Sequence, residues 1–225
     1  MLELQNRAVL QPFIQDGRIR YDKLRDFEGL EKLIIEIETS DPNEMTEKEA
    51  YAFWLNAYNI ITLKAVLEKL EIDNSWKGIT SKWKQFVFFV WNKHTIGLKK
   101  MSLYYLENKI LRKKYQDPRI HFAINCGSKS CPFLPDLLFE AETLDDYLEE
   151  LSYNFINEQK GVILKNNTLY ISRIFKLYSK DFGGENRILS FVRKYWRGES
   201  ISENVVIEFQ DYDWNLNQLS NKSGD

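Results

Sequence analysis

The sequence has few of the residues that most often build catalytic and metal sites, with two histidines and two cysteines among 225 residues. Two cysteines are too few for the disulfide framework of a small secreted domain, so they do not settle the redox compartment. No apolar run approaches the ~20 residues of a membrane span. The first seven residues lack the basic end and apolar core of a secretory signal. We therefore expect a cytoplasmic protein, or a periplasmic or secreted one whose leader has been removed.

Common ligand-binding fingerprints are also missing. The sequence contains no P-loop, no dinucleotide-binding glycine motif, no internal repeat and no regular metal-ligand spacing. A formal net charge of -2, from scattered acids and bases, gives no electrostatic case for a nucleic-acid partner. We expect no cofactor, no metal and no nucleic acid, but an unidentified small-molecule or peptide ligand. The oligomeric state stays open.

Apolar and aromatic residues are plentiful, at 44% and 14% of the chain, which is ample for a sizeable core. The length fits one compact domain, over residues 1–217, followed by a polar tail at residues 218–225 that we expect to be disordered. Helical and strand patterns both occur. The predicted fold is a single α+β domain, with N-terminal helices packed on an antiparallel or mixed sheet.

The best-signalled helix begins at Thr46, where Thr46 and Glu49 form a capping box. It runs to about Leu70, and apolar side chains surround its middle, so we expect it to be central and buried. Asn56 and Asn59 lie in this middle part. A buried amide without partners costs about 1–3 kcal/mol. Either both amides hold neighbouring backbone, or one of them orients a catalytic group or binds substrate.

Other segments have weaker patterns. The apolar run at residues 86–90 predicts a strand, and residues 94–98 predict the far arm of a hairpin, with His94 an exposed loop residue. Ser102 is the expected N-cap of another helix. Glu107 on that helix either reaches inward or pairs with a surface lysine. Further on, the patterns predict a helix at 143–156, a hairpin around residues 166–167, a helix at 188–196 and a strand at 205–209.

Residues 117–134 hold the most chemistry-like cluster. Arg119 to Cys126 alternates well enough to predict a strand, bounded by turn signals. Side chains two apart share a strand face, which would bring Arg119, His121 and Asn125 together. A cation, an imidazole and an amide on one face indicate a binding or catalytic site.

Both cysteines of the chain lie in the same segment. Pro132 after Cys131 favours the start of a helical turn, whose positive end would stabilise a thiolate. Cys126 is closer to His121 in sequence, but strand parity sends it to the opposite face. Spacing alone does not choose between the two thiols.

Four blocks of sequence together resemble a known family, at residues 53–59 (FWLNAYN), 117–132 (DPRIHFAINCGSKSCP), 174–182 (IFKLYSKDF) and 212–217 (YDWNLN). The chain resembles the family catalogued as domain of unknown function 547, in its bacterial type, over about residues 9–217. The resemblance implies no activity, because the family's function is not established. Bacterial members of this kind are often secreted proteins or lipoproteins, and plant members carry a coiled coil that is absent here.

One position departs from the family pattern. The family helix often reads Ile-Glu-His where this chain has Leu106-Glu107-Asn108. If that histidine were indispensable, this protein would be inactive or would use His121 alone.

The first functional hypothesis is a thiol-dependent hydrolase or acyl transferase, in which a cysteine attacks a carbonyl and His121 is the general base. Glu107 or Asn56 would orient the imidazole, and Asn125 or nearby backbone amides would bind an oxyanion. The catalytic candidates are Cys131, Cys126, His121 and Glu107; the substrate-binding candidates are Asn56, Asn59, Arg119 and Asn125.

Two alternatives stay open. A metal site could use the same cysteines with His121 and Glu107, although a gap of four residues between cysteines suits zinc less well than two. A non-catalytic binding module would use Arg119 and Lys129 to hold an anionic group, with structural cysteines that are bridged or reduced and buried.

Overall fold

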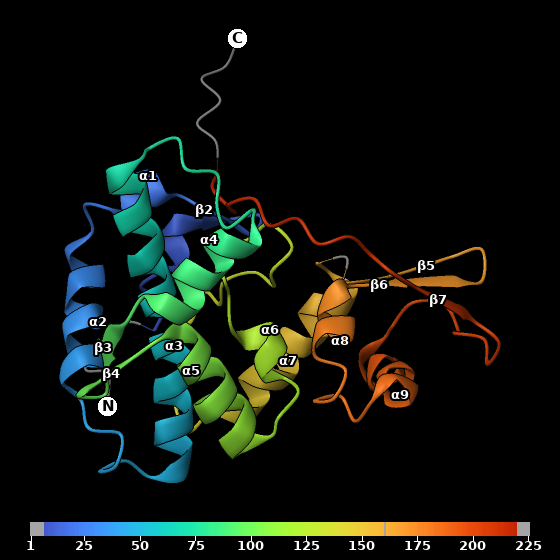
Figure 1. Cartoon of the computed structure of the whole chain (residues 1–225). Helices are drawn as coiled ribbons and strands as arrows, with labels where there is room; N and C mark the ends of the chain where they lie inside the picture. The colour runs from blue at the N-terminus through green and yellow to red at the C-terminus, as the bar shows by residue number, and fades with distance from the viewer. Residues whose placement is uncertain (1–6, 160, 220–225) are drawn as a thin grey trace.

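The computed structural model of the chain describes residues 7–159 and 161–219, which form a single α+β domain (Figure 1). The helices are η1 (Gln11–Phe13), α1 (Tyr21–Leu24), α2 (Glu28–Thr39), α3 (Glu47–Ile72), α4 (Lys82–Phe86), η2 (Val87–Trp91), α5 (Leu103–Tyr105), η3 (Leu106–Tyr115), α6 (Ile120–Ala123), α7 (Leu144–Asn157), α8 (Arg173–Leu177) and α9 (Glu185–Tyr195). The strands are β1 (Ile14–Gln15), β2 (Arg18–Ile19), β3 (His94–Ile96), β4 (Lys99–Met101), β5 (Val162–Lys165), β6 (Thr168–Ile171) and β7 (Val206–Phe209). Among the described residues, no helix has the length and apolar character needed to cross a bilayer.

Helix α3 is the centre of the fold, as its sequence predicts. The Thr46 side chain accepts a hydrogen bond from the Glu49 amide, and the Thr46 amide donates to Glu49 Oε2 at 2.8 Å, so both halves of the capping box form. Every residue from Ala50 to Leu63 is buried. Helix α3 is therefore covered on all sides by other elements of the fold.

The core consists of two clusters. The larger one surrounds α3 and includes side chains of α2, of the β3–β4 hairpin and of η3. The smaller one is formed by α7, α8, α9 and the strands β5 and β6. Helix α6 lies at their junction, because Phe122 belongs to the smaller cluster whereas Ile120 and Ala123 belong to the larger.

The described strands form three small sheets. Two are two-stranded hairpins, β1–β2 and β3–β4, and α2 packs against β3. The third is mixed, with β5 antiparallel and β7 parallel to β6. It extends away from α3 on the side of α8 and α9 (Figure 1). The α+β class is therefore confirmed, and the predicted hairpin around residues 166–167 is β5–β6.

The predicted strand over residues 119–126 is wrong, because α6 occupies its middle. The carboxylate of Asp117 accepts a hydrogen bond from the Arg119 amide at 2.9 Å, which forms the turn typical of aspartate ahead of a helix. Pro118 lies between these two residues, and the fixed φ of proline suits the same turn. The common strand face expected for Arg119, His121 and Asn125 therefore does not exist, and the three side chains diverge.

The strand predicted for residues 86–90 is also wrong, because these residues continue α4 into η2. Ser81 Oγ accepts a hydrogen bond from the Lys84 amide at 3.2 Å and caps the start of this helix. Phe88 is buried and stacks on Trp76, with ring centroids 6.1 Å apart. The apolar run therefore buries Phe88 from a helix, against an aromatic ring that lies outside the run.

His94 is buried on β3 opposite Met101, not exposed in a loop. The prediction that residues 94–98 form the far arm of a hairpin is also wrong, because residues 94–96 are the first strand, β3, and pair with β4. Because α2 covers β3, the imidazole lies against the core rather than in water.

The C-terminal segment returns from the mixed sheet to the N-terminal part of the molecule (Figure 1). Gln218 and Leu219, placed in the predicted polar tail, pair with β2, and residues 220–225 lie outside the described residues. This return carries Tyr212 to the junction of the two clusters. Its isolated bridges are Asn215–Gly78, Leu216–Ser128 and Gln218–Ile19.

Candidate functional site

A cavity of about 430 Å³ lies where the two core clusters meet. Its walls are mainly apolar and aromatic, with a small set of polar and sulfur-containing side chains. All four catalytic candidates of the sequence line it. The side chains with chemistry to offer are Tyr58, Glu107, His121, Cys126, Cys131, Tyr178 and Tyr212.

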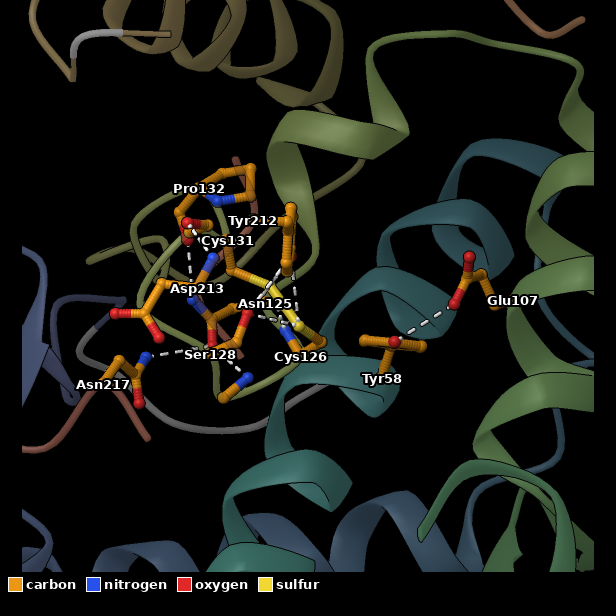
Figure 2. The surroundings of a disulfide bond; sticks show 12 residues. Tyr58, Glu107, Asn125, Cys126, Ser128, Cys131, Pro132, Tyr212, Asp213 and Asn217 are labelled. Atoms are coloured by element: carbon orange, nitrogen blue, oxygen red, sulfur yellow. Dashed lines mark hydrogen bonds between the residues drawn. A yellow bond between two sulfur atoms is a disulfide. The ribbon is translucent and has the colours of Figure 1, made fainter. Parts of the chain in front are cut away.

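Cys126 and Cys131 are joined by a disulfide on the cavity wall (Figure 2). Asn125 holds the loop between them: its Oδ1 accepts from the Gly127 amide at 2.8 Å, and its Nδ2 donates to the Pro132 carbonyl at 2.6 Å. Gly127 has a φ of 82°, a conformation that glycine adopts without strain. The two cysteines are therefore bridged in this structure, which is one of the alternatives considered from the sequence. A nucleophilic thiol requires reduction of this disulfide.

Three groups able to donate lie near Cys131 Sγ. The Cys126 amide lies 3.1 Å away, the Tyr212 hydroxyl 3.2 Å and the Ser128 hydroxyl 3.4 Å. The Ser128 and Tyr212 hydroxyls also lie near Cys126 Sγ, at 3.1 Å and 3.6 Å, and Ser128 donates to Tyr212 at 3.1 Å. Burial raises the pKa of Tyr212 to about 12, so its hydroxyl stays protonated at neutral pH and is able to donate. In the reduced protein this arrangement would stabilise negative charge on Cys131.

His121 is almost fully buried, and its partner is a residue that the sequence did not indicate. Nε2 lies 2.8 Å from Asp181 Oδ2, and Arg112 binds both oxygens of the same carboxylate. Burial opposes ionisation of Asp181, but hydrogen bonds from His121 and Arg112 hold its pKa well below its ordinary value. Asp181 is therefore an ionised carboxylate that accepts a hydrogen bond from the Nε2–H group of His121.

The imidazole is neutral, because burial lowers the pKa of His121 below its ordinary value despite the hydrogen bond to Asp181. With the proton on Nε2, Nδ1 carries a free lone pair. Nδ1 is buried and has no hydrogen-bond partner among residues 7–159 and 161–219. A neutral imidazole oriented by a carboxylate, with one nitrogen left unprotonated, has the form of a general base.

Glu107 is buried, so its side chain reaches inward rather than pairing with a surface lysine. Its Oε2 accepts a hydrogen bond from the Tyr58 hydroxyl at 3.1 Å (Figure 2). The Tyr178 ring stacks on His121 with 3.9 Å between centroids. Burial raises the pKa of both Tyr58 and Tyr178 well above the ordinary value, so each keeps its proton. Glu107 thus belongs to a tyrosine-lined wall, while Asp181 takes the orienting role first considered for it.

The two amides of α3 bind backbone. Asn56 donates to the Phe139 carbonyl and accepts from the Phe139 amide, both at 2.9 Å. Asn59 donates to the Ala123 carbonyl at 2.9 Å and accepts from the Asn125 amide at 2.8 Å. These contacts fit the alternative in which both amides hold neighbouring chain. Asn56 also lines a second cavity, of about 310 Å³, away from the disulfide.

Arg119 is engaged with acidic side chains. It lies 2.7 Å from Asp117 and 3.1 Å from both Asp145 and Glu149. These carboxylates neutralise the charge of the guanidinium, so Arg119 has little capacity left to bind an anionic ligand. The Asn125 side chain is likewise occupied, by its hydrogen bonds within the disulfide loop.

Sequence reasoning missed Arg112, Asp181 and the three tyrosines as parts of one site. Tyr178, Asp181 and Tyr212 lie within the blocks that carry the family resemblance, and their polar side chains were the available signal. Arg112 has no such signal, because nothing in its own helix indicates a partner near residue 181.

A family model described as "Protein of unknown function, DUF547" matches residues 42–156 of the chain. The matched region runs from the start of α3 to the end of α7, and it includes Glu107, His121 and both cysteines. Tyr178 and Tyr212 follow it in the sequence and line the same cavity, and Asp181, which also follows it, contacts His121 at 2.8 Å. No curated protein and no solved structure matches the chain significantly.

Proposed function

Since the chain belongs to the DUF547 family, whose description names no activity, we propose its function from the cavity: a cysteine-dependent hydrolase or acyl transferase. Cys131 is the nucleophile once the disulfide is reduced, and His121 is the general base. One observation carries the proposal. The sulfur that accepts from a backbone amide and lies near two hydroxyls lines the same cavity as the imidazole with an unpartnered Nδ1.

The first step is reduction of the disulfide. A dithiol reductant supplies two electrons and two protons, becomes a disulfide itself, and leaves Cys126 and Cys131 as thiols. The Ser128 and Tyr212 hydroxyls lie near both sulfurs, and the Cys126 amide, which donates to Cys131 Sγ, then favours the thiolate of Cys131. Cys126 has no backbone amide donating to its sulfur among the described contacts. Cys131 is therefore the more strongly stabilised thiolate.

Acyl transfer follows in two steps. Cys131 Sγ attacks the carbonyl carbon of an ester, thioester or amide, and the bond to the leaving group breaks with its electron pair. His121 takes up the thiol proton at Nδ1 and passes it to the leaving group. Water or an acceptor nucleophile then attacks the thioester, loses a proton to Nδ1, and releases Cys131. Asp181 stabilises the intermediate imidazolium.

The test uses p-nitrophenyl acetate with protein reduced by a phosphine. We expect an acetyl adduct on Cys131 by mass spectrometry, together with turnover. Cys131→Ser should abolish both, and His121→Gln should lower turnover by about 10²-fold or more. Cys126→Ser should react without reductant. A reduced, folded protein with no adduct on Cys131 would overturn the proposal.

A second candidate is a non-catalytic ligand-binding module in which the disulfide is structural. The bridged sulfurs and the Asn125 hydrogen bonds favour it, as does a cavity volume in the range of ligand pockets. The double variant Cys126→Ser/Cys131→Ser distinguishes the two. A variant that stays folded but loses all esterase activity supports the enzyme; a loss of stability, with a wild type that is inert after reduction, supports the binding module.

A further inference from the structure

Residues 74–106 contain no aspartate or glutamate, although the whole chain has 33 acidic residues. The same stretch contains six lysines, at positions 77, 82, 84, 93, 99 and 100. A chain of net charge -2 therefore has one continuous segment that is purely basic. This segment includes α4, η2, the β3–β4 hairpin and α5.

Large aromatic side chains are exposed in the same segment. Trp83 is 71% exposed, Trp91 is 70% exposed and Phe86 is 42% exposed. Trp83 stacks on Phe86, with ring centroids 5.8 Å apart, so these two rings form one apolar surface. Lys82 and Lys84 flank Trp83 and are also exposed. A contiguous exposed apolar surface rimmed by polar side chains marks an interaction site.

This surface borders the mouth of the 430 Å³ cavity. Phe86, Tyr104 and Leu177 line the cavity and are also 42%, 48% and 52% exposed. Together with Trp83 they are called the aromatic rim. Lys82 lines the cavity as well, so positive charge lies directly beside the rim.

We propose that the aromatic rim docks on a membrane surface that contains anionic phospholipid. Tryptophan and tyrosine are favoured at the boundary between headgroups and acyl chains, and phenylalanine and leucine are favoured just below it. Lysines beside them attract anionic headgroups. The acid-free segment supplies this charge complementarity without a repelling carboxylate of its own. Docking places the cavity mouth at the lipid surface, and it does not depend on whether Cys131 reacts.

Single-stranded nucleic acid also uses aromatic rings with basic side chains. The rim fits it less well, because Phe86 and Leu177 offer no polar group, and the segment has lysine but no arginine to stack on bases. A second copy of this chain is the remaining occupant, and the experiment below separates all three.

The test is flotation of the whole protein with phosphatidylcholine vesicles, with or without 30% phosphatidylglycerol. We expect binding only to the anionic vesicles, with a blue shift of tryptophan emission, and at least tenfold weaker binding in 0.5 M salt. Trp83→Ser/Phe86→Ser and Lys82→Glu/Lys84→Glu should each weaken binding at least tenfold. The matched controls are Ile35→Ser, at another half-exposed apolar side chain, and Lys165→Glu, at an exposed lysine on β5; both should bind like the wild type.

Several outcomes overturn the proposal. They are no flotation with anionic vesicles by folded protein, equal flotation of the rim and control variants, or tighter binding to an oligothymidylate than to vesicles. A dimer in sedimentation velocity that the rim variants dissociate, without vesicle binding, would assign the rim to a second copy. Circular dichroism of every variant excludes misfolding as the cause of a loss.

Discussion

Tyr212 brings a hydroxyl from the C-terminal segment to within 3.2 Å of Cys131 Sγ. A hydrogen bond to a charged acceptor contributes about 1.5–3 kcal/mol, and part of the resulting loss of thiolate is offset by greater nucleophilicity. We predict that Tyr212→Phe slows iodoacetamide alkylation of reduced Cys131 at pH 7 by about 3–10-fold. Quantitative mass spectrometry of the Cys131 peptide measures this rate. Tyr170→Phe, on β6, is the control, and equal rates in the two variants would contradict the role of Tyr212.

His94 makes folding sensitive to acid. Its Nε2 is buried without a hydrogen-bond partner among the described residues, and burial lowers the pKa of His94 to about 4. The unfolded chain, with a histidine pKa of about 6.5, binds a proton first as pH falls. The contribution of neutral His94 is therefore fully present above pH 6.5 and is lost as pH falls toward 4, by about 3 kcal/mol.

The prediction for His94 is checked by urea unfolding from pH 7 to pH 4. We expect the free energy of unfolding of the wild type to fall by about 3 kcal/mol more than that of His94→Gln over this range. The variant starts from a lower stability at pH 7, so the slopes are compared rather than the absolute values. Parallel curves would show that His94 titrates normally.

Asn59 is the contact through which α3 fixes the end of α6. Its amide binds the Ala123 carbonyl and the Asn125 amide, at the point where the chain leaves α6 for the disulfide loop. We predict that Asn59→Leu lowers the free energy of unfolding by about 2–4 kcal/mol, because two buried backbone groups lose their partner. Thr46→Ala, which removes only the cap of the same helix, should cost about 1 kcal/mol. Similar losses in the two variants would contradict the prediction.

Elements whose signals are local are predicted well from the sequence. The capping box of α3, the Ser102 cap of α5 and the amphipathic face of α7 are patterns within one helix, and each is confirmed. The errors at residues 86–90 and 119–126 come from segments decided by distant partners. Trp76 packs on the first, and Asn59 and Asp117 determine the conformation of the second. The alternation of apolar residues within a segment gives no information about such distant partners.

At the scale of the molecule, the site exists because the chain crosses the junction of its two clusters several times. Tyr58 comes from α3, His121 from α6, Tyr178 follows α8, and Tyr212 lies in the returning C-terminal segment. The sequence indicates His121 and the cysteines because they are rare and close together. It does not indicate that Asp181 faces His121, since the two are 60 residues apart and their proximity depends on how the clusters pack.

Asp181 connects the two parts of the molecule, because it binds Arg112 of η3 and His121 of α6 from the chain that follows α8. Although burial opposes its ionisation, these hydrogen bonds hold the pKa of Asp181 well below the unfolded value of about 3.9. The stabilisation is therefore present above about pH 4 and is lost as pH falls below it, a window distinct from that of His94. We predict that Asp181→Asn lowers the free energy of unfolding by about 2–3 kcal/mol at pH 6 and by much less near pH 2.

Guanidinium unfolding at pH 6 and pH 2 measures both values for wild type and variant. Asp211→Asn is the control, because Asp211 pairs with Arg173 at a fully exposed position and should change stability little at either pH. Proton NMR adds a local observable, since Asp181→Asn should shift the Nε2 proton resonance of His121. If the stability difference between wild type and Asp181→Asn were the same at both pH values, the ionised carboxylate would not be what joins Arg112 and His121. The imidazole would then owe its orientation to stacking on Tyr178.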